Sequence, residues 1–398
     1  TFQFPVLIVL FPLFTALLVT VVGWFKPRYV YYMTVLGLLG SVYSAVKVAL
    51  KINVEGAQHY YLGNWPAPFG IEYVVDHLNA LVLVMVTLVS FLTAVYSKRS
   101  VEKEIGDRIA SFYTLFLLLI TGLLGITITG DAFNLYVLME VSALTSYGLL
   151  AFGKGRSYLS TFNYVIMGSM GACFYLLGVG YLLIKTGSLN MLDMSRILSS
   201  VYLSQSILIA FIFIIVGLWI KMAFFPLHGW LPNAYSQAPV AVACLVAPLM
   251  TKVAIYVMVR MMFFVFSADY VYQILNWQPW IVGLSILAIV VGSLYAVAQR
   301  RLKKMLTYLV VAEIGYMVGG VWLGTTQGIR GAIYHILADG LMTLCLFMAV
   351  GALIYKVGED RFGSIQGKFR QMPVTMMVFL VGAFSMIGIP PTCGFFSK

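Results

Sequence analysis

Apolar stretches of about 20 residues recur along the whole chain, and they constrain its fold more than any other feature. A helix of that length crosses a hydrocarbon core about 30 Å thick, whereas one soluble core could not bury so many of them. Only 10% of the 398 residues are charged and 61% are hydrophobic, against a charged share of roughly a quarter in soluble domains. The sequence therefore predicts an all-α polytopic membrane protein.

We place twelve membrane spans on this pattern. The first lacks the basic leader of a signal peptide and is as long as a full span, so we count it as a span. The one long connection, residues 51–76, contains Pro, Gly and aromatic residues, and we expect an outer hairpin there. The spans cover residues 4–24, 29–50, 77–97, 110–129, 132–152, 160–185, 204–226, 240–265, 277–298, 304–324, 328–355 and 374–398.

The basic residues between spans predict the orientation, because inside connections of membrane proteins carry the excess of positive charge. With the N-terminus outside, the inside connections hold sixteen Lys and Arg residues and the outside connections five. The inside residues are Lys26, Arg28, Lys98, Arg99, Lys103, Arg108, Lys154, Arg156, Arg300, Arg301, Lys303, Lys304, Lys356, Arg361, Lys368 and Arg370, and the outside ones Lys51, Lys185, Arg196, Arg260 and Arg330. The net charge of +11 therefore indicates topology rather than a nucleic acid partner.

No metal or cofactor site is predicted in this chain. Its cysteines lie in separate apolar runs without CxxC spacing, which gives no sign of zinc or an iron–sulfur cluster. The extramembrane connection of residues 51–76 contains no nucleotide-binding loop or catalytic triad, so no catalytic centre is predicted either. The cysteines are Cys173, Cys244, Cys345 and Cys393.

Ionisable residues lie inside several predicted spans, where an unpaired charge is costly and often marks a functional site. Two of them, His335 and Asp339, are four residues apart and hence share one helix face. A histidine with an acid one turn away is a plausible proton carrier. The full set is Glu140, Lys221, Lys252, Glu313, His335, Asp339 and Lys398.

Two interpretations of these charges are open. Static ion pairs could hold the helices together, which bilayers permit. Alternatively, the groups exchange protons along a relay. Two buried lysines follow the single acid Glu140, and a buried lysine without an acid partner gives up its proton readily. We therefore favour a relay through Glu140, Lys221, Lys252, His335 and Lys398, with His228, Glu313 and Asp339 as further candidates.

Prolines fall beside the buried lysines. Interrupted helices leave backbone groups unpaired at membrane depth and usually line wet cavities or ion sites, although a proline can also simply kink a helix. The similar positions of Lys221 and Lys398 beside such breaks predict two related halves. The prolines are Pro226 and Pro232 around His228, Pro248 in the eighth span, and Pro390 with Pro391 before Lys398.

Three strings carry a resemblance to one known family. Together they are similar to the antiporter-like membrane subunits shared by respiratory complex I, Mrp-type sodium/proton antiporters and membrane-bound hydrogenases, and the resemblance covers nearly the whole chain. The run Phe133-Asn-Leu-Tyr136 most resembles the Mrp D-type subunit and its hydrogenase counterpart. The strings are Gly130-Asp-Ala-Phe-Asn-Leu-Tyr-Val-Leu-Met-Glu140, Lys221-Met-Ala-Phe-Phe-Pro-Leu-His-Gly-Trp-Leu-Pro-Asn-Ala-Tyr-Ser-Gln-Ala-Pro239 and Leu302-Lys-Lys-Met-Leu-Thr-Tyr308.

The resemblance implies two inverted five-helix repeats with broken helices at the ion path. They would occupy residues 110–265 and 266–398, after an N-terminal three-helix segment at 1–109. Because members of the family continue beyond the twelfth helix, we expect the second repeat to be incomplete in this sequence. Either further residues of this protein or another chain would complete it, and the lack of an initiator Met favours the former.

The resemblance also implies roles for single residues. Glu140 and Lys221 would form the coupling pair of the first half, Lys252 the central relay and Lys398 the terminal lysine of the second half. His335 resembles the histidine of the family's eleventh helix. Two residues of that helix, Asp339 and Thr343, depart from the family pattern and put its usual route in doubt, and Glu313 could compensate.

We therefore expect an ion-translocating subunit, moving H⁺ and/or Na⁺, of an energy-converting complex in a prokaryotic cell membrane. Its partners would be other antiporter-like subunits, with or without a peripheral redox module of the hydrogenase or NADH dehydrogenase kind. Iron–sulfur clusters or a nickel–iron centre would belong to those partners. Two alternatives stay open: a structural membrane anchor with static ion pairs, and a stand-alone secondary transporter.

Overall fold

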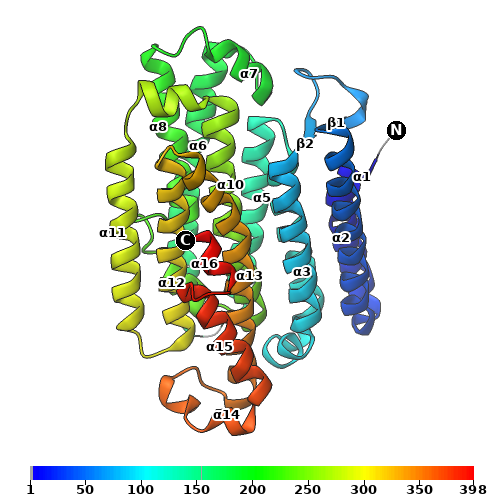
Figure 1. The fold of residues 1–398 in the computed structure, drawn as a ribbon. Coiled ribbons are helices and arrows are strands. Elements are labelled where there is room, and N and C mark those ends of the chain that lie inside the picture. The colour runs from blue at the N-terminus through cyan, green and yellow to red at the C-terminus, as the bar shows by residue number, and fades with distance from the viewer. Residues whose placement is uncertain (1–2, 154) are drawn as a thin grey trace. The chain divides into compact units, whose positions relative to one another are not determined.

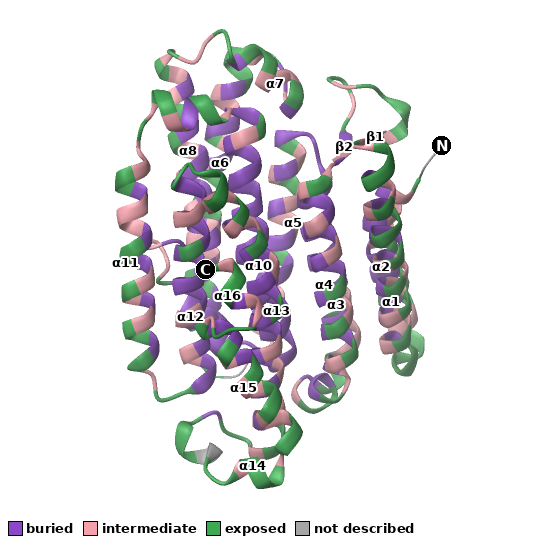
Figure 2. Cartoon of the chain, in the orientation of Figure 1, coloured by how far each residue is buried: buried purple, intermediate pink, exposed green. Residues whose placement is uncertain are grey.

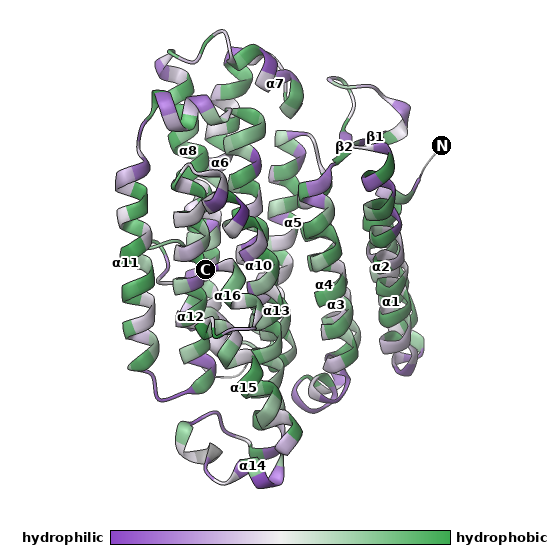
Figure 3. Cartoon of the chain, viewed as in Figure 1, coloured by the Kyte–Doolittle hydropathy of each residue, from purple (hydrophilic) through white to green (hydrophobic). Residues whose placement is uncertain are grey.

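The computed structural model describes residues 3–153 and 155–398, so Lys154, one of the predicted inside residues, lies outside the described residues. Within these ranges, eleven helices are long and apolar enough to cross a membrane (Figure 1). Hydrophobic residues run along the long helices and hydrophilic residues gather in the connections between them (Figure 3). The prediction of an all-α polytopic membrane protein is confirmed.

The chain forms two compact units that interleave in sequence. The first comprises Thr1–Leu149, Val165–Lys221 and Tyr256–Leu275, and the second Leu150–Tyr164, Met222–Ile255 and Asn276–Lys398. Compactness and internal repetition are different properties, so the predicted repeats at 110–265 and 266–398 remain a prediction.

The first unit consists mainly of long helices and one small sheet. Its helices pack in sequence order, α1 on α2 and α2 on α3, and α1 also packs on α4. The elements that lie wholly or mostly in this unit are α1 (Phe4–Phe25), α2 (Val30–Glu55), β1 (Gln58–Tyr61), β2 (Glu72–Val75), α3 (His77–Glu104), α4 (Ile109–Ile128), α5 (Ala132–Ala151), α6 (Ser157–Thr186), α7 (Met191–Leu198), α8 (Gln205–Met222), and the π-helical turns Met261–Val265 and Tyr270–Ile274.

The second unit holds the remaining helices. Within it α12 packs on α11, α13 and α9, and α13 also packs on α15 and α16. Its elements are α9 (Leu231–Gln237), most of α10 (Val240–Arg260), α11 (Gln278–Val297), α12 (Leu302–Trp322), α13 (Thr326–Val357), α14 (Lys368–Gln371), α15 (Pro373–Ile387) and α16 (Cys393–Ser397). Burial differs sharply among the spans: 94% of the apolar window containing α10 is buried, against 28% of that in α11 (Figure 2).

Two of the predicted helix breaks are present. The seventh span stops at Met222, where Ala223 has a φ of 60°, and the chain turns through His228 before α9 starts. The twelfth span is divided into the 15-residue α15 and the short α16, with Pro390 and Pro391 between them. The eighth behaves differently, because α10 continues through Pro248 as one helix.

The connection between α2 and α3 contains an antiparallel hairpin in which Gln58 faces Val75 and Tyr61 faces Glu72. The Glu72 side chain is 4% exposed, and one of its oxygens lies 2.5 Å from Nδ1 of His59. Its other oxygen accepts a hydrogen bond from the Asn190 amide at 3.0 Å. Burial in the hairpin raises the pKa of Tyr73 to about 12. The hairpin is therefore fixed to the helices rather than free in solvent.

Asp76 ends the hairpin and starts α3. Its Oδ1 accepts hydrogen bonds from the backbone N–H groups of Leu78 and Asn79, and its own N–H donates to the Asn79 side chain at 2.7 Å, which completes a capping box. Its Oδ2 forms an ion pair with Arg260 at the end of α10. Arg260, placed by sequence in an outside connection, is thus a helical residue with a 6% exposed side chain.

An Asp76→Asn variant should separate these two roles. Asn caps a helix as well as Asp does, so this change removes only the ion pair and leaves Arg260 buried without a carboxylate. We expect a loss of about 2 kcal/mol or more in unfolding free energy for Asp76→Asn. Asp76→Ala should cost about 1 kcal/mol more, because the cap is lost too. Thermal unfolding of the purified variants measures both steps, and equal values for Asn and wild type would contradict the proposed importance of the ion pair.

Candidate functional site

The first charge pair lies in the first unit and joins α5 to α8. Lys221 Nζ donates a hydrogen bond to Glu140 Oε1 at 3.2 Å, and the two side chains are 10% and 27% exposed. Helices α6 and α8 pack closely, which helps to place Lys221. A Cβ atom added to Gly171 of α6 would lie only 3.0 Å from the Gly217 carbonyl oxygen of α8, so the two backbones can approach this closely only with glycine there. The helix ends one residue after Lys221, so the lysine lies where backbone groups leave the helical pattern.

The start of α5 explains part of the string that ends in Glu140. The Asn134 backbone N–H donates to Asp131 Oδ1 at 2.6 Å, which caps the helix, and the Asn134 side chain donates to the Thr129 hydroxyl at 2.9 Å. A Cβ on Gly130 would lie 2.9 Å from the Val74 side chain of the hairpin. The string therefore fixes the start of α5, and Glu140 lies more than two turns further along it.

The second pair lies in the second unit and is wholly enclosed. Lys252 Nζ on α10 is 2.6 Å from Asp339 Oδ2 on α13, and both side chains are 0% exposed. Lys252 also donates to the Ala247 carbonyl at 3.1 Å, and the Thr343 hydroxyl donates to Asp339 Oδ1 at 2.9 Å. Asp339 is thus the partner of Lys252, and Thr343 supports that partner.

The third group is built around Glu313 on α12. Its Oε1 accepts a hydrogen bond from Lys398 Nζ at 2.8 Å, and its Oε2 lies 2.7 Å from His335 Nε2. The other ring nitrogen of His335 is 2.7 Å from the Ser397 hydroxyl. The carboxylate of Glu313 therefore holds two basic groups, Lys398 and His335. Lys398 also donates to the Met386 carbonyl at 2.6 Å. Glu313 and Lys398 line a cavity of about 320 Å³.

These contacts correct one inference from the sequence. The sequence predicts that the buried lysines after Lys221 have no acid partner, whereas each of the three lysines has a carboxylate oxygen within 3.2 Å. Spacing in sequence could not show this, because Asp339 and Glu313 come from other helices. The surplus of buried bases is therefore not an argument against static ion pairs.

Helix α13 joins two of the three groups into one row. Both His335 and Asp339 are buried and lie one turn apart, as their spacing predicted. Asp339 contacts Lys252 and His335 contacts Glu313, so the row runs from Lys252 through α13 and Glu313 to Lys398. His228 stands apart: it stacks on Phe225 at 5.4 Å and forms no ion pair with any residue that the structure describes.

The role of the string at 302–308 was not predicted. Lys303, placed by sequence in an inside connection, is 6% exposed and donates to the Ala238 carbonyl just after α9. One turn later, the Thr307 hydroxyl lies 3.4 Å from the Pro232 carbonyl oxygen and 2.7 Å from the Lys304 carbonyl of its own helix. The Ala238 and Pro232 carbonyls lie in the segment that follows the break at Met222, where backbone groups need partners outside a long helix. Resemblance marked this string, but only the fold shows its task.

No set of three or more His, Cys, Asp or Glu residues within the described ranges is arranged to hold a metal ion. The site consists of lysines, carboxylates and a histidine, all of which can take up and release protons.

Residues 129–398 match the family described as NADH:quinone oxidoreductase/Mrp antiporter, TM. The chain belongs to this family. It is 40% identical to the NADH-quinone oxidoreductase subunit N of Desulforudis audaxviator (strain MP104C), over 100% of this chain and 79% of that protein. It is 30% identical to the D-type Na(+)/H(+) antiporter subunit of Bacillus subtilis (strain 168), again over 100% of this chain and 79% of that protein.

A solved structure shares the fold of this antiporter family member. A chain of the membrane-bound sulfane sulfur reductase, an archaeal respiratory membrane complex, superposes with a TM-score of 0.93 at 27% identity. The match covers 100% of this chain and 80% of that one. Together with the family match, this confirms the resemblance inferred from the three strings.

Proposed function

We propose that this chain is an ion-translocating subunit, moving H⁺ or Na⁺, of a multi-subunit complex in a prokaryotic cell membrane. The main observation behind this proposal is the row of paired ionisable side chains on α10, α13, α12 and the end of the chain, together with the pair between α5 and α8. Relatives named as subunits of an NADH-quinone oxidoreductase and of a Na(+)/H(+) antiporter support this reading.

The pair on α5 and α8 is suited to loading a proton. A carboxylate 3.2 Å away favours the charged form of Lys221, and separation of the two groups favours release of its proton. A change in the distance between Glu140 and Lys221 therefore changes how strongly the proton is held. A transmembrane potential of 100 mV adds about 2.3 kcal/mol of bias for each charge that crosses.

The row in the second unit is suited to passing a proton along. His335 has one ring nitrogen beside Glu313 and the other beside Ser397, so a proton can enter on one nitrogen while another leaves from the other. Since Glu313 serves both His335 and Lys398, gain of a proton by one base weakens the hold of the carboxylate on the other. In this proposal Glu313 takes part in the relay, together with Asp339 as partner of Lys252.

Several wider features belong to the same proposal. The pairs Glu140–Lys221 and Glu313–Lys398 each lie beside a helix break, which supports two related halves at 110–265 and 266–398. The excess of basic residues in one set of connections supports an N-terminus outside. Redox centres such as iron–sulfur clusters or a nickel–iron centre would belong to partner subunits, and other antiporter-like subunits would be the membrane partners.

A structural anchor is the second candidate, because every lysine of the site has an acid partner, as static ion pairs would. A stand-alone transporter of a small solute is the third. Uptake of a solute by the chain reconstituted alone would favour it over both others.

Replacing Glu140 by Gln in the assembled complex should lower ion flux at least about tenfold, because Lys221 then lacks the charge that controls its proton. Proteoliposomes with a pH-sensitive dye, tested with and without Na⁺, measure the flux and identify the ion. Glu55→Gln is the matched control, since Glu55 is 55% exposed and pairs only with Lys51 one turn away among the described residues. Wild-type pumping by the Glu140→Gln complex would favour the anchor.

A further inference from the structure

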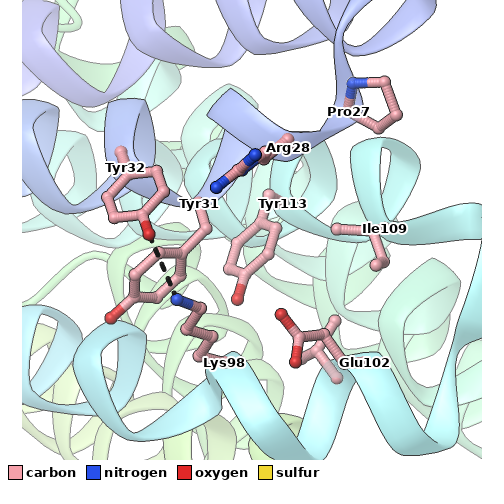
Figure 4. Close-up of a pocket in the computed structure, with 9 residues that line it drawn as sticks. Pro27, Arg28, Tyr31, Tyr32, Lys98, Glu102, Ile109 and Tyr113 are labelled. Carbon is pink, nitrogen blue, oxygen red and sulfur yellow. Dashed lines mark hydrogen bonds between the residues drawn. The ribbon is translucent and has the colours of Figure 1, made fainter.

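A pocket of about 390 Å³ opens at one end of the first unit, where the turn between α1 and α2 meets the end of α3 and the start of α4. Figure 4 shows its polar side chains converging on one space: Arg28 from the turn, Lys98 from α3, Tyr31 and Tyr32 from α2, and Tyr113 from α4. Volumes of about 300–1,000 Å³ are usual for small-ligand sites.

The two basic groups of the pocket lack a carboxylate partner among the described residues. Lys98 Nζ donates to the Tyr32 hydroxyl at 3.3 Å and lies 5.0 and 5.1 Å from the ring centroids of Tyr32 and Tyr31. These contacts hold the ammonium group but leave its charge uncompensated. Arg28 directs its guanidinium into the pocket and forms no ion pair with any part of the chain that the structure describes (Figure 4).

The remaining lining defines what can occupy the pocket. Glu102, one turn after Lys98, is the single acid of the described lining, which carries two positive charges and one negative. Val101, Ile109 and Pro27 form an apolar wall beside the charged groups. A fitting ligand therefore has an anionic group next to an apolar part.

We infer that this pocket binds the headgroup phosphate of an anionic phospholipid. Arg28 and Lys98 would hold the phosphate, with the Tyr32 hydroxyl, which accepts from Lys98, as a further donor, and the apolar wall would contact the upper acyl chains. Basic pockets between spans on the cytoplasmic side bind anionic headgroups, and Lys26 in the turn with Arg99 and Lys103 near the end of α3 lead us to expect this end on that side. The inference concerns lipid binding and holds whether or not the chain moves ions.

The test is lipid retention by the protein purified with its companion subunits. Native mass spectrometry after titration with phosphatidylglycerol or phosphatidylcholine gives the affinity for each. We expect a clear preference for phosphatidylglycerol, and a loss of that preference of about 30-fold in Arg28→Gln/Lys98→Gln, because each direct contact of a basic side chain with the phosphate contributes about 1 kcal/mol. Glu102→Gln should instead strengthen phosphatidylglycerol binding, since it removes the negative charge of the pocket.

The matched control is Lys26→Gln/Arg99→Gln, which removes the same charge from the same turn and the same end of α3 but from exposed residues outside the pocket. An equal loss in this control, or an unchanged preference in Arg28→Gln/Lys98→Gln, would overturn the inference.

A competition experiment with the water-soluble ester glycerol 1-phosphate distinguishes a lipid headgroup from a free phosphate ester as the ligand. If glycerol 1-phosphate displaces phosphatidylglycerol at equal concentration, the site binds free phosphate esters and the lipid assignment is wrong. The opposite effect of Glu102→Gln keeps the test decisive if the double variant fails to fold.

Discussion

A Lys221→Arg variant is expected to assemble normally and to lose at least about 100-fold in ion flux. Arginine keeps a positive charge beside Glu140 and can donate the same hydrogen bond, so a static pair would survive the change. Its guanidinium is effectively never deprotonated in proteins, so it cannot release a proton. The substitution therefore separates the two candidate functions more sharply than loss of the side chain does.

The measurement is flux in proteoliposomes beside a gel-filtration profile of the complex. Lys47→Arg is the control, because Lys47 is an exposed lysine of α2 that lies over the Tyr43 ring and belongs to no proposed relay. Lys221→Ala should lose both flux and part of the stability, since Glu140 is left without its cation. If the Lys221→Arg complex pumps as well as wild type, Lys221 does not pass protons and the anchor function stands.

The helices were predictable because a single physical requirement sets them. Each crossing needs about 20 apolar residues, and the predicted spans at 77–97 and 277–298 differ little from α3 and α11 at their N-terminal ends. The breaks after Met222 and around Pro390 were signalled by proline. Pro248 carried the same signal, yet α10 stays continuous, because packing on all sides can hold a helix together across one missing hydrogen bond.

The members of the site were predictable, but their pairing was not. Ionisable residues inside apolar runs are rare, so the sequence alone indicates Glu140, Lys252 and Asp339. Which acid meets which base depends on helix neighbours far apart in sequence, so the prediction that Lys252 has no acid partner is wrong. Lys303 and Arg260 were misplaced for a related reason: a basic residue near the end of a span is read as a loop residue, although both are buried in helices.

Removing the partner of Lys252 should have the largest effect on stability. In an Asp339→Ala variant the ammonium group of Lys252, 0% exposed, loses its carboxylate and keeps only the Ala247 carbonyl, while Thr343 loses its acceptor. Breaking a buried ion pair by deleting one member costs about 3–5 kcal/mol, because the other charge stays in a medium that solvates it poorly. Chemical unfolding of the purified complex should show a loss of that size.

The double variant Lys252→Met/Asp339→Leu removes both charges at similar volume and should recover most of that stability, because no uncompensated charge remains. The relay and the anchor then predict different ion fluxes for this double variant. If Lys252 and Asp339 only hold α10 against α13, the stable double variant pumps ions normally. If they pass protons between the two helices, it is well folded and inactive, since methionine and leucine have no exchangeable proton. A stable, fully active double variant would remove the central pair from the proposed ion path.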